Sequence, residues 1–204
     1  MIGRRFLHDT RGASAVEFAL VTPLVILFLL GLFDSGFYAW RFNQTEKAAQ
    51  MGLRYAVVTN SVSSDLNTAT YVGDTHCTPN PLTAGDTICA AALGRLTCGS
   101  ASCRCDAAPC PGTTRDANAF ANVAKRIRAF APWVKNENIE IEYTGSGLGF
   151  AGDPNGMSIQ PIVGIKLINV STRPMTGLLF GAQLSLPNII RSLPMEDGKG
   201  TQGN

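Results

Sequence analysis

The stretch RGASAVEFALVTPLVILFLLGLFDSGFYAW, from Arg11 to Trp40, decides the architecture of this chain. The sixteen residues between Glu17 and Asp34 carry no charge, and most are Leu, Val, Ile, Phe or Ala. A helix needs roughly 20 predominantly apolar residues to cross the hydrocarbon core of a bilayer. The mostly apolar segment that begins at Ala13 has 28 residues, and its aromatic end suits a membrane–water interface. The sequence therefore predicts a transmembrane helix at about residues 16–40.

A cleaved secretory signal peptide and the buried core helix of a soluble domain are the two alternatives. The apolar core of a signal peptide usually has about 7–15 residues and ends at a small-residue cleavage site. This apolar run is longer, and the helical pattern continues after Asp34, Ser35 and Gly36. Few soluble helices are apolar on every face over such a length. We therefore expect a retained anchor.

The charges on either side of the apolar run predict its orientation and a functional residue. Arg4, Arg5 and Arg11 precede the run and only Asp9 opposes them, so the N-terminus is expected in the cytoplasm and the rest of the chain outside. Glu17 lies at the edge of the run, where a carboxylate is costly unless it is paired or reaches water. Its position therefore suggests a functional residue, and extension of the side chain toward the headgroups is the simpler alternative.

Glu17 would be the fifth residue if the chain were cut between Gly12 and Ala13, and this arrangement resembles the type IV prepilin processing site. The wider string, with TEKAAQMGLRYAVV after it, resembles the TadE-like family of minor pseudopilins and membrane-anchored components of the tight-adherence (Flp pilus) machinery. The resemblance covers roughly Arg11 to Val58, about a quarter of the chain. It is carried by Arg11–Gly12, Glu17–Phe18, Pro23, Gly31, Ala48–Ala49, Gly52 and Arg54–Tyr55–Ala56.

The resemblance implies roles for residues at the start of the helix. Gly12 and Ala13 would flank the prepilin-peptidase cleavage, and Glu17 and Phe18 would serve docking or assembly. In Flp-type pilins a Tyr usually follows the Glu, so Phe18 is a departure that leaves room for an uncleaved scaffold protein. The implied partners are the bacterial inner membrane, other pilins and pilus-assembly membrane proteins, and a prepilin peptidase. The same membrane is the implied location, with possible entry into the pilus.

The expected domains follow in chain order. Residues 1–12 are a cytoplasmic leader, and residues 11–53 are the TadE-like segment, whose helix is expected to continue unbroken from Ala13 to Val58. Pro23 lies within the span, where the lost backbone hydrogen bond predicts a kink near Ala19. Residues 54–194 form an exported domain with a Cys-rich loop at 77–110, in which a helical fragment is expected around Thr87–Leu96. The last residues, 195–204, are expected to be disordered.

All six cysteines lie between residues 77 and 110, and an exported segment favours three disulfides because thiols oxidise outside the cytoplasm. Six cysteines allow 15 pairings, which the sequence does not distinguish. Cys103 and Cys105 are too close to pair easily with each other. A metal knuckle is the alternative, but the spacing C-x4-C-x-C-x4-C lacks the C-x2-C pair of zinc sites. The cysteines are Cys77, Cys89, Cys98, Cys103, Cys105 and Cys110.

The remainder of the exported domain predicts a helix and about three antiparallel strands. Asp116 is expected to cap an amphipathic helix that presents Phe120, Val123, Ile127 and Phe130 on one face and ends at Pro132. Strict alternation over 139–143 predicts a half-buried strand, with Glu140 and Glu142 facing solvent. Residues 158–171 predict a second strand, 174–180 a short apolar turn or helix, and 182–193 a third strand that Pro187 interrupts. The expected fold is α+β and pilin-like: a long N-terminal transmembrane helix, a small antiparallel sheet and a disulfide-rich loop.

Composition and motifs argue against several function classes. Seventeen basic and fifteen acidic residues give a net charge of +2 without a basic cluster, so nucleic acid is not an expected partner. His8 and His76 have no obvious nucleophile beside them, and Ser146 lacks the G-x-S-x-G context of a nucleophile elbow. We therefore expect that the protein is not an enzyme and that it binds neither a cofactor nor a metal ion. Three functions remain: a processed minor pseudopilin, an uncleaved bitopic scaffold, or an anchored receptor or enzyme.

Overall fold

The computed structural model describes residues 13–154, 156–177, 181–196 and 198, which belong to two compact units. The first unit comprises Met1–Arg41 and Ser171–Leu184, and the second comprises Phe42–Val170 and Ser185–Asn204. Helix α1, Ala13–Ala56, contributes its N-terminal part to the first unit and its C-terminal part to the second. The predicted unbroken helix is thus confirmed, and it ends two residues before Val58.

The first unit combines the N-terminal part of α1 with a short arm, of which residues 171–177 and 181–184 are described. Strands β5, Ser171–Thr172, and β6, Leu184–Ser185, pair with each other at the base of this arm. At its described end the backbone N–H of Gly177 donates to the carbonyl of Pro174 at 3.0 Å, which forms the predicted turn. Leu178, Leu179 and Phe180, predicted to complete a short apolar turn or helix, lie outside the described residues.

The second unit is built around a five-stranded sheet in the order β2-β1-β3-β4-β7, with every neighbouring pair antiparallel. The strands are β1 Arg95–Cys98, β2 Cys103–Ala107, β3 Ile139–Thr144, β4 Ile162–Leu167 and β7 Ile189–Pro194. The strands predicted at 139–143 and 158–171 correspond to β3 and β4, and the third, at 182–193, corresponds to the two successive strands β6 and β7. Pro187 separates β6 from β7, as predicted.

Strands β1 and β2 lie in the Cys-rich segment that the sequence predicted to be a loop. The prediction of a helical fragment around Thr87–Leu96 was wrong. Only the 3-10 turn η3, Ala90–Ala92, is helical there. Strand β1 already begins at Arg95. In the sequence these two strands are too short and polar to show the alternation of apolar and polar residues that is typical of a strand. They form because β1 pairs with β3 over four residues and extends the sheet beyond its apolar centre.

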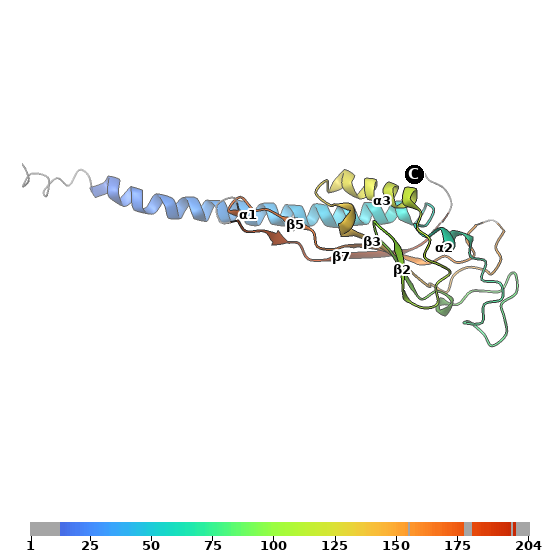
Figure 1. Ribbon diagram of the computed structural model, residues 1–204. Helices are drawn as coiled ribbons and strands as arrows, with labels where there is room; N and C mark the ends of the chain where they lie inside the picture. The colour runs from blue at the N-terminus through green and yellow to red at the C-terminus, as the bar shows by residue number, and fades with distance from the viewer. Residues whose placement is uncertain (1–12, 155, 178–180, 197, 199–204) are drawn as a thin grey trace, which may run out of the picture. The chain divides into compact units, whose positions relative to one another are not determined.

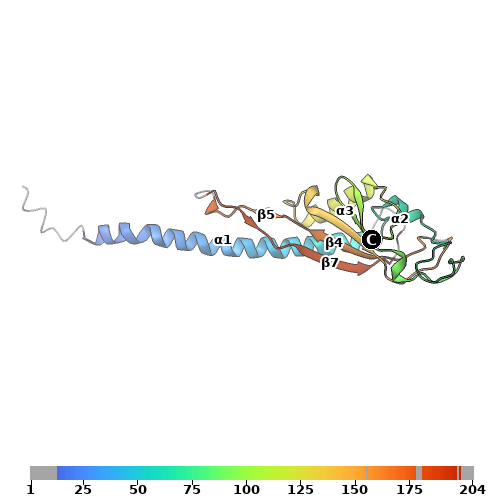
Figure 2. The same ribbon diagram turned by 60° about the horizontal axis from the view of Figure 1, so that its bottom comes forward.

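The core of the second unit lies between one face of the sheet and two helices. Helix α3, Ala117–Phe130, and the C-terminal part of α1 cover this face (Figures 1 and 2). Gly52 of α1 is the point of closest approach, because a Cβ there would overlap Ile127 of α3 and lie 3.2 Å from Ile165 of β4. The buried apolar residues of the three elements include Ala48, Ala49, Leu53, Phe120, Val123, Ile127, Ile139, Ile141, Tyr143, Val163, Ile165 and Leu167.

Helix α3 forms as its sequence predicts. The side chain of Asp116 accepts hydrogen bonds from the backbone N–H groups of Asn118 and Ala119 at 2.8 and 3.0 Å, which caps the helix. Its predicted apolar face packs inward, with Phe120, Val123 and Ile127 buried and Phe130 half-buried. Two smaller helical elements flank the sheet, α2 at Ser64–Thr68 and η4 at Asn136–Asn138.

The six cysteines form three disulfides, which confirms the expected oxidised state. They join Cys77 to Cys89, Cys98 to Cys103, and Cys105 to Cys110. Cys103 and Cys105 each have a partner elsewhere, as their proximity predicted. The last two disulfides hold β1, β2 and the segment that follows, and the first closes the polar loop before η3.

The folded chain extends further toward the C-terminus than predicted. Met195 is buried, and the backbone N–H of Glu196 donates to the carbonyl of Val57 at 3.0 Å. The prediction that disorder begins at residue 195 was therefore wrong for these two residues. Their contacts could not be seen in the sequence because Val57 is distant along the chain. Residues 197 and 199–204 lie outside the described part.

Candidate functional site

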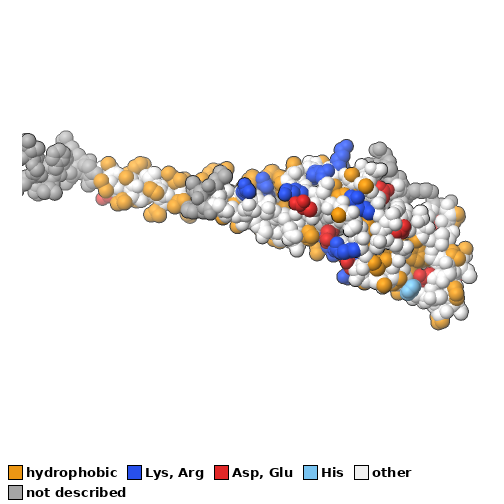
Figure 3. Space-filling model, in the orientation of Figure 1, with side chains coloured by type: hydrophobic (Ala, Val, Ile, Leu, Met, Phe, Trp, Pro, Cys, Tyr) orange, Lys and Arg blue, Asp and Glu red, His pale blue; other side chains and the backbone are white. Residues whose placement is uncertain are grey.

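The candidate site is the N-terminal part of α1, where apolar side chains surround the helix without a protein core. The most apolar 18-residue window has a mean hydropathy of 2.4, and none of it is buried within the structure. The exposed side chains include Val16, Phe18, Leu20, Leu24, Phe28, Leu32 and Phe33. On the face that Figure 3 shows, hydrophobic side chains follow one another along this part of the helix. Such a helix suits a lipid environment and suggests a single-pass membrane anchor.

Two hydroxyl groups of this part of α1 are paired within the helix. The Thr22 hydroxyl donates to the carbonyl of Phe18 at 2.6 Å, and the Ser35 hydroxyl donates to the carbonyl of Gly31 at 2.8 Å. Bonds of this kind hide hydroxyl groups from hydrocarbon, where unpaired donors are costly. Pro23 lies within α1, which continues past it; the kink expected near Ala19 stays a prediction.

The residues predicted for processing and assembly lie at the start of α1. Gly12, on one side of the predicted cleavage, lies outside the described residues, and Ala13 is the first residue of the helix. Glu17 and Phe18 are both exposed on the first turns. An exposed carboxylate next to an exposed aromatic ring, at the head of an apolar helix, is available to a partner. Their roles stay predictions.

Asp34 is a site residue that the sequence reasoning missed. Only 8% of this residue is exposed. Its carboxylate accepts hydrogen bonds from the backbone N–H of Met175 at 2.5 Å, the backbone N–H of Thr176 at 2.9 Å and the Thr176 hydroxyl at 2.6 Å. We call this arrangement the Asp34 clasp. The sequence showed Asp34 only as the end of an uncharged run, because its donors lie about 140 residues later.

Aromatic and basic side chains follow Asp34 on α1. The rings of Phe37 and Trp40 stack with centroids 5.7 Å apart, and the Arg41 guanidinium lies 4.9 Å from the centre of the Phe37 ring. Trp side chains are enriched at membrane–water interfaces, and Arg side chains extend their charge toward water. This cluster therefore has the composition of one edge of a membrane span.

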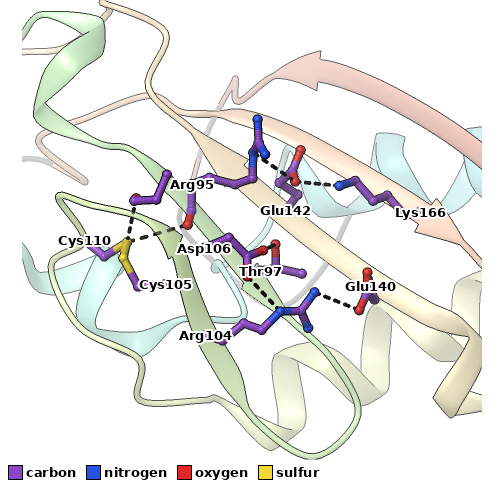
Figure 4. Close-up of polar contacts among 10 residues, drawn as sticks. Arg95, Thr97, Arg104, Cys105, Asp106, Cys110, Glu140, Glu142 and Lys166 are labelled. Atoms are coloured by element: carbon purple, nitrogen blue, oxygen red, sulfur yellow. Dashed lines mark hydrogen bonds and ion pairs between the residues drawn. A yellow bond between two sulfur atoms is a disulfide. The ribbon is translucent and has the colours of Figure 1, made fainter.

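The second unit carries a network of ion pairs on the face of the sheet opposite the helices (Figure 4). Glu142 lies between two cations, with Lys166 Nζ at 2.6 Å and Arg95 Nε at 3.5 Å. Arg104 bridges Asp106 at 2.8 Å and Glu140 at 3.0 Å. The prediction that Glu140 and Glu142 simply face solvent was therefore incomplete. Their partners come from β1, β2 and β4, so the network ties neighbouring strands together.

Thr97 and Arg104 control the charge of Asp106 in this network. The buried Thr97 hydroxyl donates to Asp106 Oδ2 at 2.6 Å. This bond, together with the Arg104 guanidinium, holds the pKa of the Asp106 carboxyl below its usual range against the opposing effect of desolvation. The Asp106 carboxyl is thus held in its charged form. The groups of the network are mutually paired, as expected of a structural rather than a catalytic arrangement.

The remaining sequence candidates have local partners. The His76 ring lies 3.0 Å from Asp74 Oδ2, and the Ser146 hydroxyl donates to the carbonyl of Gln160. His8 lies outside the described residues. In the ranges that the structure describes, no group of three His, Cys, Asp or Glu side chains is arranged to hold a metal ion. All six cysteines are consumed by disulfides, so the metal-knuckle alternative has no thiolate to offer.

Comparison with known proteins bears on the N-terminal segment. Residues 12–54 match the family model described as TadE-like protein. No curated protein and no solved structure matches the chain. The matched range coincides closely with α1, Ala13–Ala56, and with the predicted TadE-like segment at 11–53. The N-terminal segment of this chain is therefore TadE-like, which supports involvement in the tight-adherence (Tad) pilus system.

Proposed function

We propose that the chain is a minor pseudopilin of a tight-adherence (Flp, type IVb-like) pilus assembly and secretion system. It is held in the bacterial inner membrane by the N-terminal part of α1, and its domain at residues 54–194 is exported. Its partners are other pilins and the membrane proteins that assemble the pilus. We propose that it acts as a structural part of this machinery rather than as an enzyme.

One observation carries this proposal. A single TadE-like helix exposes apolar side chains along its N-terminal part, whereas its last turns pack into the core of a domain. The bare part suits lipid or the apolar helices of other subunits, whereas Ala48, Ala49 and Leu53 are buried against the sheet and α3. Export is supported by the three disulfides, since such bonds persist outside the reducing cytoplasm. Arg4, Arg5 and Arg11 support a cytoplasmic N-terminus.

Processing between Gly12 and Ala13 is part of the proposal. A cut there would leave a positively charged amine on Ala13, four residues from the Glu17 carboxylate. In a weakly hydrated environment, opposite charges attract several-fold more strongly than in water. The amine of one subunit and Glu17 of its neighbour would then neutralise each other when the helices pack together. Phe18, exposed beside Glu17, would contribute apolar contact to the same interface.

An uncleaved bitopic scaffold of the same machinery is the second candidate. It is favoured by Phe18, which stands where Flp-type pilins usually carry Tyr. In that case the leader at residues 1–12 would stay in the cytoplasm, and α1 would be a permanent anchor. The two candidates share the membrane helix and the exported domain but differ in whether the chain leaves the bilayer.

The Glu17→Gln variant tests the assembly role. In the pseudopilin proposal the variant reaches the membrane in normal amount but is depleted from sheared pili by about tenfold or more, because a charge-assisted contact is lost. The measurement is quantitative immunoblotting of the membrane and pilus fractions. Glu137→Gln is the matched control, since Glu137 is an exposed carboxylate in the second unit. Normal recovery of the Glu17 variant in pili would contradict the proposal.

A further inference from the structure

The arm that carries Met175 and Thr176 reaches α1 at a depth that the length of the apolar run defines. The sixteen uncharged residues between Glu17 and Asp34 span roughly 24 Å as a helix. The hydrocarbon core of a bilayer is about 30 Å thick. With Glu17 at one edge of the core, the opposite edge therefore falls beyond Asp34, roughly one turn further along α1.

The aromatic cluster indicates the same depth independently. Phe37, Trp40 and Arg41 have the composition of the membrane–water interface and follow Asp34 along α1. Asp34 precedes Arg41 by seven residues, or roughly 10 Å of helix. Asp34 consequently lies on the hydrocarbon side of this cluster. A carboxylate at such a depth requires partners, and the three donors of the Asp34 clasp are those partners.

The clasp also pairs backbone N–H groups in the turn of the arm at residues 174–177. In hydrocarbon every backbone N–H needs an acceptor within the protein. Asp34 accepts from the N–H groups of Met175 and Thr176, Pro174 has no N–H, and Gly177 donates to the carbonyl of Pro174. The backbone N–H groups of Met175, Thr176 and Gly177 thus all have acceptors within the protein. The Met175 residue remains 57% exposed, and Leu184 at the other side of the arm is also exposed.

We infer that the arm formed by residues 171–177 and 181–184 is a second membrane contact, in which Met175 inserts into the outer edge of the lipid layer beside α1. Arg173, which is exposed two residues earlier, suits the level of the lipid phosphates. The clasp holds the arm at this depth, because three hydrogen-bond donors of the arm replace the water that would otherwise hydrate the Asp34 carboxylate. This inference rests on the membrane anchor and holds for either the pseudopilin or the scaffold.

Photo-crosslinking to lipid tests this contact directly. The full chain, with a benzophenone amino acid in place of Met175, is reconstituted into phosphatidylethanolamine–phosphatidylglycerol vesicles and irradiated, and adducts are identified by mass spectrometry. The same probe in place of Phe28, which is 66% exposed in the apolar run, is the lipid-facing reference. Val72, which is 51% exposed in the second unit, is the reference outside the membrane.

We expect phospholipid adducts at position 175 comparable with those at position 28, and almost none at position 72. Adducts at position 28 alone would overturn the inference. Adducts that join position 175 to a second copy of the chain instead of lipid would also overturn it, because the arm would then be a protein interface. A failure of the pilus proposal would leave these yields unchanged, since they depend only on membrane insertion.

Variants of the clasp separate its role from general folding. Asp34→Ala should lower the lipid adduct at position 175 about tenfold, because charge-assisted hydrogen bonds are lost, while the adduct at position 28 stays constant. Thr176→Val removes only the hydroxyl donor and should lower the yield less. Ser35→Ala is the matched control, since Ser35 bonds only to its own helix at Gly31 in the contacts described. An unchanged yield in Asp34→Ala, with intact disulfides, would show that the clasp does not hold the arm.

Discussion

Glu17 and Asp34 bracket the uncharged run of α1, and their surroundings differ sharply. Glu17 is exposed on the first turns of the helix, whereas Asp34 is buried by three donors from the arm. A carboxylate that is already paired within its own chain contributes to folding, and one that is open is available to another molecule. This difference agrees with the proposed role of Glu17 in assembly and with the role of Asp34 in positioning the arm.

Gly52 is the glycine of α1 at which an added side chain would have the least room. In an open helix Gly→Ala stabilises by up to about 1 kcal/mol, but a Cβ at Gly52 would overlap the Ile127 side chain. We expect Gly52→Ala to lower the free energy of unfolding by about 1–3 kcal/mol, as overpacking of a core does. Denaturant unfolding of the full chain in detergent, followed by Trp fluorescence, measures this change.

Gly36→Ala is the control for this prediction, because no atom lies within 4 Å of the position of a Cβ at Gly36. This variant should unfold like the parent chain or be slightly more stable. If Gly52→Ala also proved neutral, α1 would not pack against α3 and the sheet as closely as the structure places it.

Asp106 makes the second unit sensitive to acid. Its folded-state pKa is depressed by the Thr97 hydroxyl and Arg104, so its contribution to stability is complete above the unfolded-state pKa of about 3.9 and is lost as the pH falls through the folded-state value. We expect Thr97→Val to lower the melting temperature at pH 7 and to weaken its fall on acidification below about pH 4. Melting curves between neutral and acidic pH test this. Parallel curves for the variant and the parent would refute it.

Two disulfides of equal sequence separation offer a comparison at the level of the strand pair. Cys98–Cys103 and Cys105–Cys110 are each five residues apart, but the first pair is buried in the core and the second is partly exposed. Loss of either crosslink should cost about 2 kcal/mol through the entropy of the unfolded chain. Replacement of the buried pair by alanine should cost about 2 kcal/mol more, because it also leaves a cavity. Urea unfolding of the two double variants measures the difference. Equal losses would mean that the first pair is not packed as described.

The elements that the sequence predicted well are those whose pattern is local. The apolar run of α1, the Asp116 cap of α3 and the alternation over 139–143 each lie within one contiguous segment, and each forms as expected. Strands β1 and β2 were missed because short polar strands show no period and depend on pairing with β3. The Asp34 clasp was missed for the same reason, since its two halves are far apart in the chain.

At the scale of the whole molecule, the chain combines a TadE-like helix with a disulfide-stapled α+β domain that the family match does not cover. The helix carries the features that bear on location and assembly, namely the bare apolar part, Glu17 and the predicted cleavage after Gly12. The domain carries those that bear on stability, namely three disulfides and the ion-pair network of the sheet. This division of features agrees with the role proposed above, a structural component of a pilus system.

The intact mass of the protein, isolated without reduction from its native membrane, tests the central claim most directly. The account predicts a chain that begins at Ala13 and lacks two hydrogens for each of three disulfides, which would show both processing and export. A chain that begins at Met1 with the same disulfides would identify the uncleaved scaffold. A chain that begins at Met1 with six free thiols would contradict the account, because the domain would then lie in the cytoplasm.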